Sequence, residues 1–357
     1  MDDESAAKLI DAVAMHRNIA DLMLGFNDIV GRQWIMALGN LLQKPASQLV
    51  DLNIGHNSIG NEAAAVLGNA LAKNKTLEDL DLDYNAIGDE GAAALGNSLA
   101  DNKTLKNLSL QENRNITTTG WTAFARCLFN SSLEVLGLSG NTINDEGATT
   151  LSNALANNVK LTELDLSNNL NITSSGWMAM SSLLQQPNSS LEIFCLSSTG
   201  NHITDEVAIA FANALVNNTS LRWLQFGDDH AITTRGWTAL SSTLCDKSSI
   251  ERIYSSNHTL EGVGWEPGEL ASSLQLNRNN NKAEVARQKI LQYHFSGGNT
   301  KVEEFVNMKM KVLPQAMSWI GRDVEGFLLL YQVVHSMPTL FDFDSQSKSV
   351  SGKRKRN

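Results

Sequence analysis

Carboxylates beside leucines are the residues of this sequence whose type and spacing suggest a shared chemistry. Around position 80 the chain reads LEDLDLDY, so Asp79, Asp81 and Asp83 alternate with Leu80 and Leu82. Alternation with a period of two is typical of a strand that has one apolar face and one polar face. Carboxylates gathered on the polar face would attract a basic partner, and they would also repel one another.

Other reactive residue types lack the spacing that catalysis or metal binding needs. The histidines, such as His56 and His202, are scattered at repeat-to-repeat distances and do not have metal-ligand spacing. Cys127, Cys195 and Cys245 are too few and too irregular for a disulfide framework or a metal cluster. Cys195 is expected on the polar side of a strand, but no histidine stands in a predictable partner position. We therefore predict no enzyme activity, no metal and no cofactor.

The net charge and the distribution of apolar residues exclude further classes of protein. A formal net charge of −10 over 357 residues argues against a general nucleic-acid binder and favours a basic partner. No stretch approaches the roughly 18 apolar residues of a membrane span, and the acidic N-terminus does not resemble a signal peptide. We therefore predict no membrane association and a cytoplasmic protein. The basic run at 353–356 is a weak nuclear import signal, so a nuclear location stays open, as does the oligomeric state.

The alternating strand belongs to a unit that recurs every 28 to 30 residues. Each predicted strand is followed by a helical spacing of three and four, as at Ala92, Leu95 and Leu99. A unit this short cannot bury a core alone, so its copies must stack. Nine copies align on their first apolar residues, which are Ile19, Leu49, Leu77, Leu105, Leu133, Leu161, Leu191, Leu221 and Ile250.

The shared pattern is L-x-x-L-x-L-x-x-N-x-I, as in LEVLGLSGNTI from Leu133. It resembles the leucine-rich repeat, and its long helical half is similar to the ribonuclease-inhibitor-like subclass. The resemblance covers about residues 2–265. It implies an α/β solenoid, a horseshoe with parallel strands on the concave face and helices on the convex face. It also implies an asparagine ladder, here Asn27, Asn57, Asn85, Asn113, Asn141, Asn169 and Asn201.

We predict four regions along the chain. Residues 1–18 form the helix of a partial N-terminal repeat, and residues 19–268 form the array of about nine strand-helix units. Residues 269–344 form a helical C-terminal cap, with helices expected at 269–295, 302–320 and 323–336. Residues 345–357 form a disordered basic tail. The partial first repeat leaves open whether the chain is a fragment of a longer repeat protein.

The outward strand positions of such a solenoid form an open sheet face, because helices cover the other face. One column of this face reads Asp21, Asp51, Asp79, Asn107, Val135, Glu163, Ile193, Trp223 and Arg252. The next column includes Asp81, Asp165, Cys195 and Tyr254, and the turns add Phe26, His56, Asp83 and Tyr84. Like charges on adjacent strands destabilise a sheet by up to about 1 kcal/mol. The stacked carboxylates therefore suggest a binding role, although short acidic residues are also common as soluble surface at these positions.

We accordingly predict a non-catalytic scaffold that binds a partner protein, with a basic segment, on the concave face. The segment would lie along the carboxylates and contact large aromatic side chains. The predicted binding residues are Asp21, Asp51, Asp79, Asp81, Asp83, Tyr84, Glu163, Asp165, Trp223, Arg252 and Tyr254.

Two alternatives stay open. The repeats are similar to those of Ran GTPase-activating proteins, which implies a GTPase activator, although a basic tail replaces that family's acidic one. They are also similar to the repeats of NLR-type receptors, which implies a detached ligand-sensing domain of a larger receptor.

Overall fold

The computed structural model describes residues 1–295, apart from positions 17, 46, 187 and 280 and the stretches 198–202, 228–230 and 265–267. The helices predicted at 302–320 and 323–336, the predicted tail, Asn201 and His202 lie outside the described residues.

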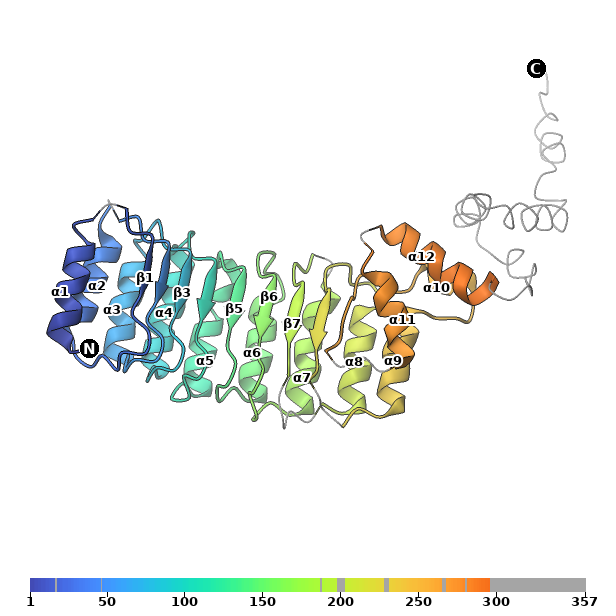
Figure 1. Cartoon of the computed structure of the whole chain (residues 1–357). Helices are drawn as coiled ribbons and strands as arrows, with labels where there is room; N and C mark the ends of the chain where they lie inside the picture. The colour runs from blue at the N-terminus through green and yellow to red at the C-terminus, as the bar shows by residue number, and fades with distance from the viewer. Residues whose placement is uncertain are drawn as a thin grey trace, which may run out of the picture.

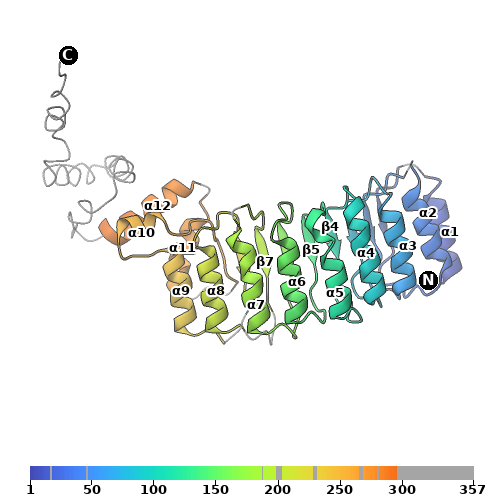
Figure 2. The ribbon, with the colours of Figure 1, turned by 180° about the vertical axis from the view of Figure 1, so that it is seen from behind.

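The described chain alternates strands with helices in two layers. Its strands form one parallel sheet in sequential order, and the helices lie along one face of that sheet (Figures 1 and 2). The other face is left open, which confirms the predicted α/β repeat solenoid. The strands are β1 (Asp21–Met23), β2 (Asp51–Asn53), β3 (Asp79–Asp81), β4 (Asn107–Ser109), β5 (Val135–Gly137), β6 (Glu163–Asp165), β7 (Ile193–Cys195) and β8 (Trp223–Gln225).

Each strand is followed by a helix that packs against the helices of the neighbouring units. The helices are α1 (Asp3–Val13), α2 (Gln33–Gln43), α3 (Asn61–Leu71), α4 (Asp89–Asp101), α5 (Thr118–Ala125), α6 (Asp145–Leu155), α7 (Ser174–Ser181), α8 (Asp205–Leu215), α9 (Thr234–Leu244), α10 (Ile250–Tyr254), α11 (Gly268–Asn277) and α12 (Lys282–Ile290). Two short 3₁₀ segments, η1 (Leu128–Asn130) and η2 (Ser182–Gln185), follow α5 and α7, and a π-helical segment, η3 (Leu291–Phe295), follows α12.

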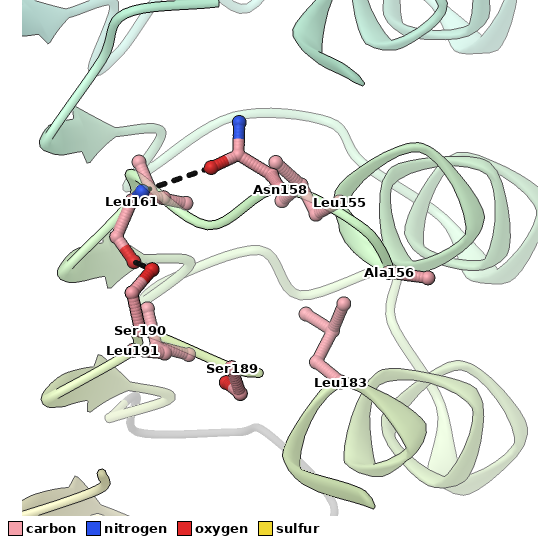
Figure 3. A pocket seen from close by; sticks show the side chains of 8 residues that line it. All are labelled: Leu155, Ala156, Asn158, Leu161, Leu183, Ser189, Ser190 and Leu191. Carbon is pink, nitrogen blue, oxygen red and sulfur yellow. Dashed lines mark hydrogen bonds between the residues drawn. The ribbon is translucent and has the colours of Figure 1, made fainter. Parts of the chain in front are cut away.

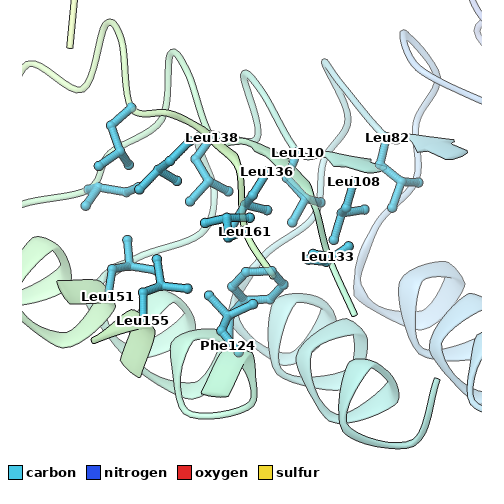
Figure 4. Close-up of a cluster of buried hydrophobic side chains, with 14 of the residues drawn as sticks. Leu82, Leu108, Leu110, Phe124, Leu133, Leu136, Leu138, Leu151, Leu155 and Leu161 are labelled. Carbon is cyan, nitrogen blue, oxygen red and sulfur yellow. The ribbon is translucent and has the colours of Figure 1, made fainter. Parts of the chain in front are cut away.

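A continuous apolar core fills the space between the sheet and the helices (Figure 4). The middle residue of each strand points into this core, and the register places these residues directly opposite one another. Full burial of one such side chain contributes about 1.5–3 kcal/mol. The row comprises Leu22, Leu52, Leu80, Leu108, Leu136, Leu164, Phe194 and Leu224, each no more than 7% exposed.

The predicted asparagine ladder is confirmed within the described residues. Asn85 is typical, because its amide nitrogen donates to Ile54 O and Leu82 O while its oxygen accepts from Ile59 N. The side chain thus satisfies backbone groups of two successive units where the strand ends. Asn57, Asn113, Asn141 and Asn169 donate in the same way.

A second asparagine ladder, which sequence reasoning missed, lies before the strands. Asn102, for example, donates to Leu71 O at the end of α3 and accepts from Leu105 N. It therefore ties the last turn of α3 to the segment that leads into β4. Equivalent bonds are made by Asn74, Asn158, Asn218 and Asn257.

The ninth copy differs from the prediction. Residues 250–254 form the helix α10 and not a strand, since Ile250 and Ile253 are buried with the three-residue spacing of a helix. The strand position is taken by Gly262, which forms a parallel bridge with Trp223. The unit is longer than its neighbours, because 39 residues separate Leu221 from Leu260, the equivalent first leucine.

Two side chains from α11 and α12 end the second asparagine ladder. Lys289 is fully buried, and its ammonium donates to Leu244 O at 2.6 Å and to Asn257 O at 3.3 Å. Asn277 donates to Leu260 O at 2.7 Å. A lysine thus stands where the next ladder asparagine would be, and it satisfies the carbonyls that would otherwise be unpaired.

Candidate partner-binding face

Five carboxylates lie together on the N-terminal part of the open face. We call Asp21, Asp51, Asp79, Asp81 and Asp83 the acidic strip. The register places Asp21 opposite Asp51 and Asp51 opposite Asp79. Parallel strands are about 4.8 Å apart, so three like charges follow one another at that spacing. The structure thus brings together the carboxylates that the column pattern predicted.

Asp51 stands at the centre of the strip. Partial burial raises the pKa of its carboxyl group, and the carboxylates of Asp79, Asp21 and Asp81 raise it further. Within the described residues, no hydrogen bond or ion pair reaches its side chain. The ionised group is therefore uncompensated in the free protein, and a partner cation would relieve it.

Neighbouring polar groups hold the carboxylates of Asp79 and Asp81 in place. Asn107 donates to Asp79, and Asn53 donates to the Asp81 carboxylate at 2.6 Å. The second Asp81 oxygen accepts from Asp83 N at 2.9 Å. These bonds orient the strip, and they come from neutral groups that leave its negative charge in place.

Asp83 lies deepest, in the turn after β3. Its carboxylate accepts from Ser109 Oγ at 2.5 Å and from Gln111 N at 2.7 Å. Burial nevertheless raises its pKa to about 6, with a contribution from Asp81. The hydrogen bonds and His56 act in the opposite direction without cancelling the effect of burial.

The two other predicted carboxylates lie apart from the strip. Glu163 and Asp165 are on β6, and the uncharged pair Val135 and Gly137 on β5 separates them from the N-terminal strands. Asp165 accepts from Ser167 N at 2.8 Å, a local turn bond. These residues therefore form a separate and smaller acidic site on the same face.

Trp223 is half-buried at the C-terminal end of the face. Its ring lies on Gly262, where a Cβ atom would come within 2.2 Å of the ring. The guanidinium of Arg278 is 6.0 Å from the ring centre. On β7, Ile193 is directly opposite it, so this end of the face is apolar. The ring remains accessible, but less than the sequence suggested.

Arg252 and Tyr254 do not belong to this face. Both lie on α10, and Gly262 and Gly264 occupy the strand positions that were assigned to them. The sequence IERIY imitates the leucine spacing of a repeat strand, which explains the wrong assignment.

Three aromatic rings form a stack at the edge of the acidic strip. We call Phe26, His56 and Tyr84 the aromatic stack. The Phe26 and His56 ring centres are 3.8 Å apart, those of His56 and Tyr84 are 4.1 Å apart, and the planes are within 18° of parallel. Phe26 is 75% exposed and Tyr84 is 49% exposed. Sequence reasoning placed Tyr84 in the site but not the other two, although rings at equivalent positions of three successive units were the available signal.

All three stack residues have left-handed backbone conformations, with φ between 52° and 58°. For bulky residues this conformation costs about 1–2 kcal/mol each. Each parallel ring pair stabilises the fold by about 0.5–1.5 kcal/mol. The two contacts therefore offset only part of the cost of three strained residues, so stability alone does not account for the rings.

A family model described as the leucine-rich repeat matches residues 73–96, 129–152 and 157–181. Each matched segment contains one strand and most or all of the following helix, namely β3 with α4, β5 with α6, and β6 with α7. The same unit continues on both sides of them in the sheet. The chain is a leucine-rich repeat protein.

Three solved structures have weak similarity to this leucine-rich repeat protein. The leiomodin-1 actin-binding site 2 is 19% identical with a TM-score of 0.37, over 43% of this chain and 88% of that one. The tropomodulin C-terminal domain of Caenorhabditis elegans is 16% identical with a TM-score of 0.33, over 52% and 92%. A chain of the yeast Rad7 and Elc1 complex is 18% identical with a TM-score of 0.36, over 66% and 69%. No curated protein sequence matches.

Cys195 on β7 is the reactive side chain that the sequence places on the open face, and its thiol is partly buried. Burial raises the pKa of the Cys195 thiol to about 12, and Asp165 and Glu163 raise it further, so the thiol is protonated at neutral pH. No group of three potential metal ligands occurs among the described residues. No described helix is long and apolar enough to cross a membrane.

Two hollows among the described residues are smaller than a typical ligand pocket of about 300–1,000 Å³. The crevice in Figure 3 lies between α6 and η2 and holds about 20 Å³, with Asn158 and Ser190 bonded to the backbone of Leu161. A second hollow of about 240 Å³ lies beside His16 and Lys44. The open face is therefore the better candidate for function.

Proposed function

We propose that this leucine-rich repeat protein is a non-catalytic scaffold that binds a basic segment of a partner protein along the acidic strip. The observation that supports this most strongly is the in-register row of Asp21, Asp51 and Asp79 on an uncovered sheet face. Partial burial raises the pKa of Asp51, and the neighbouring carboxylates raise it further, so keeping this row ionised has a cost. A cationic segment would remove that cost, so binding gains from the repulsion it relieves.

The other end of the face suggests how the segment is oriented. Trp223 and Ile193 form an apolar end, six strands along the sheet from Asp51. At about 4.8 Å per strand the two ends are roughly 29 Å apart. A partner segment with basic residues at one end and a large apolar residue at the other would match both.

The proposal is tested by affinity capture from the native cell with two charge-matched variants. In the first, Asp51, Asp79 and Asp81 are all replaced by Asn, which keeps the side-chain shape and the turn bond to Asp83 N. In the second, Asp11→Asn, Asp101→Asn and Glu146→Gln change three exposed carboxylates on the helices. Both variants lose the same net charge.

We expect the first variant to lose the partners that the wild type captures and the second variant to retain them. Exposed ion pairs contribute about 0.2–1 kcal/mol each, so three of them correspond to a loss of roughly tenfold in affinity. If both variants capture the same partners as strongly as the wild type, the acidic strip is only surface and the proposal is wrong.

We also propose a reducing compartment, the cytoplasm or the nucleus. All three cysteines are free thiols, and Cys245 is buried. Unpaired thiols are typical of proteins kept in a reducing environment. Redox-sensitive fluorescent fusions, localised in the native cell, test this directly: fluorescence in the secretory pathway would contradict it.

A further inference from the structure

The aromatic stack is the feature of the face that the proposed function does not use. Phe26, His56 and Tyr84 follow β1, β2 and β3 at equivalent positions, each donating its backbone N–H to the next unit. Phe26 and Tyr84 keep large exposed areas. Two exposed rings beside a charged surface require an explanation beyond solubility.

The fold does not require rings at this position. Later units place Glu112, Gly140 and Asn168 there, with φ of 57°, 70° and 58°, and these residues make the same backbone bond to the next unit. Glycine and asparagine adopt this conformation more easily than an aromatic residue does. The rings are therefore an addition of the first three units, which are also the units that carry the acidic strip.

The surroundings of the stack favour a planar cation. Asp83 precedes Tyr84 in the chain and lies close enough to His56 for their charges to interact. Asp28, which is exposed, follows two residues after Phe26. On the far side of Tyr84, Arg114 is already paired with Glu112 at 2.7 Å. Ring faces next to carboxylates suit a group that stacks and donates hydrogen bonds at once.

We propose that the aromatic stack is the contact site for an arginine side chain of the partner's basic segment. This rests on the proposed function, since the acidic strip supplies the charge that holds the segment. A guanidinium is planar and weakly hydrated, so it lies flat on a ring while its edge donates to a carboxylate. A lysine ammonium is compact and strongly hydrated, and it gains less from the rings.

The experiment measures the affinities of octa-arginine and octa-lysine peptides for the full chain by fluorescence polarisation. The test variant carries Phe26→Asn and Tyr84→Asn, since asparagine occupies the equivalent position at Asn168 with φ of 58°. The control variant carries Phe129→Asn, which removes a ring that is 50% exposed on η1, away from the strip. Thermal unfolding of each variant confirms that it is folded.

We expect the test variant to bind octa-arginine about two- to fivefold more weakly than the wild type, the effect of an exposed cation–π contact. Its affinity for octa-lysine and the behaviour of the Phe129→Asn control should be unchanged. If the test variant binds octa-arginine as tightly as the wild type does, the arginine contact is wrong and the acidic strip proposal stands. If the wild type binds neither peptide, both proposals are wrong.

Discussion

Asp83 is the residue of the acidic strip whose pKa is raised the most. It is held by Ser109 and Gln111, yet burial raises its pKa to about 6 from an ordinary value of 3.8. The folded chain therefore keeps this proton to a higher pH than the unfolded chain does. The free energy of unfolding therefore falls as the pH rises from 3.8 to about 6, because the folded chain must ionise a buried carboxyl group. Above pH 6 the full cost of this ionisation remains.

Replacing Asp83 with Asn should stabilise the protein at neutral pH. The amide oxygen can still accept from Ser109 and Gln111, while the charge is absent. Because solvent screens this partly exposed site, we expect a gain of about 1 kcal/mol in the free energy of unfolding above pH 6. Urea unfolding at several pH values measures it. The gain should vanish near pH 4, and a gain that is the same at all pH values would contradict the assignment.

At the scale of elements, helices are capped by residues of the preceding unit. Asp145, at the start of α6, accepts from Thr173 N at 2.7 Å and Gly176 N at 3.1 Å, at the start of α7. A Cβ atom at Gly176 would lie 2.5 Å from the same carboxylate oxygen. This explains the glycine before Trp177 in the repeat. Asp89 and Asp205 cap α5 and α9 in the same way.

Replacing Asp145 with Ala should therefore weaken the contact between two units. Loss of a helix cap costs about 0.5–2 kcal/mol, and here the cap also links α6 to α7. Glu146→Ala, one residue along, removes an exposed carboxylate of the same helix turn and serves as the control. Thermal unfolding should show a lower midpoint for Asp145→Ala alone. Equal midpoints in the two variants would show that the inter-unit cap contributes nothing.

The buried Lys289 makes the C-terminal end of the array sensitive to pH. Burial lowers its pKa to about 7, with Lys282 acting in the same direction and Cys245 opposing it. His258, 3.3 Å from the ammonium, is held neutral by burial, which lowers its pKa to about 4. Below pH 7 the folded state holds a buried charge, and this cost is relieved as the pH rises toward the unfolded value of 10.5.

We expect the free energy of unfolding of the wild type, relative to Lys289→Met, to increase between about pH 7 and pH 10. The comparison cancels the titration of shared groups that do not interact with Lys289. Chemical unfolding across this range measures the difference. A constant difference would show that Lys289 keeps an ordinary pKa in the folded chain.

For the whole molecule, the fold was predictable because the same leucine spacing recurs in successive units, although the spacing in one unit is ambiguous. The spacing of Leu80 and Leu82 is weak evidence alone, but the same spacing in successive units indicates stacked strands. The prediction of a strand in the ninth unit was wrong because an inserted helix, α10, carries Ile250 and Ile253 at a spacing that resembles the repeat. A single copy offers no such recurrence, so the inserted helix and the displaced strand position at Gly262 went unrecognised.

The candidate site was predictable only in part. Strand register follows from the repeat, so the column of Asp21, Asp51 and Asp79 could be assembled from the sequence. Ring stacking depends on backbone conformation in the turns, which the pattern does not reveal, so the stack of Phe26 and His56 on Tyr84 was missed. Lys289 was missed because the backbone carbonyls that it binds belong to residues 32 and 45 positions away, in other units.

Calorimetric titration of octa-lysine into the full chain measures directly whether the acidic strip binds a basic segment. We expect the wild type to bind the peptide and the binding to weaken with added salt. Replacing Asp51, Asp79 and Asp81 with Asn should weaken it roughly tenfold, while the charge-matched change of Asp11, Asp101 and Glu146 should not. Equal affinities of the two variants would show that only net charge matters and that the acidic strip is not the binding site.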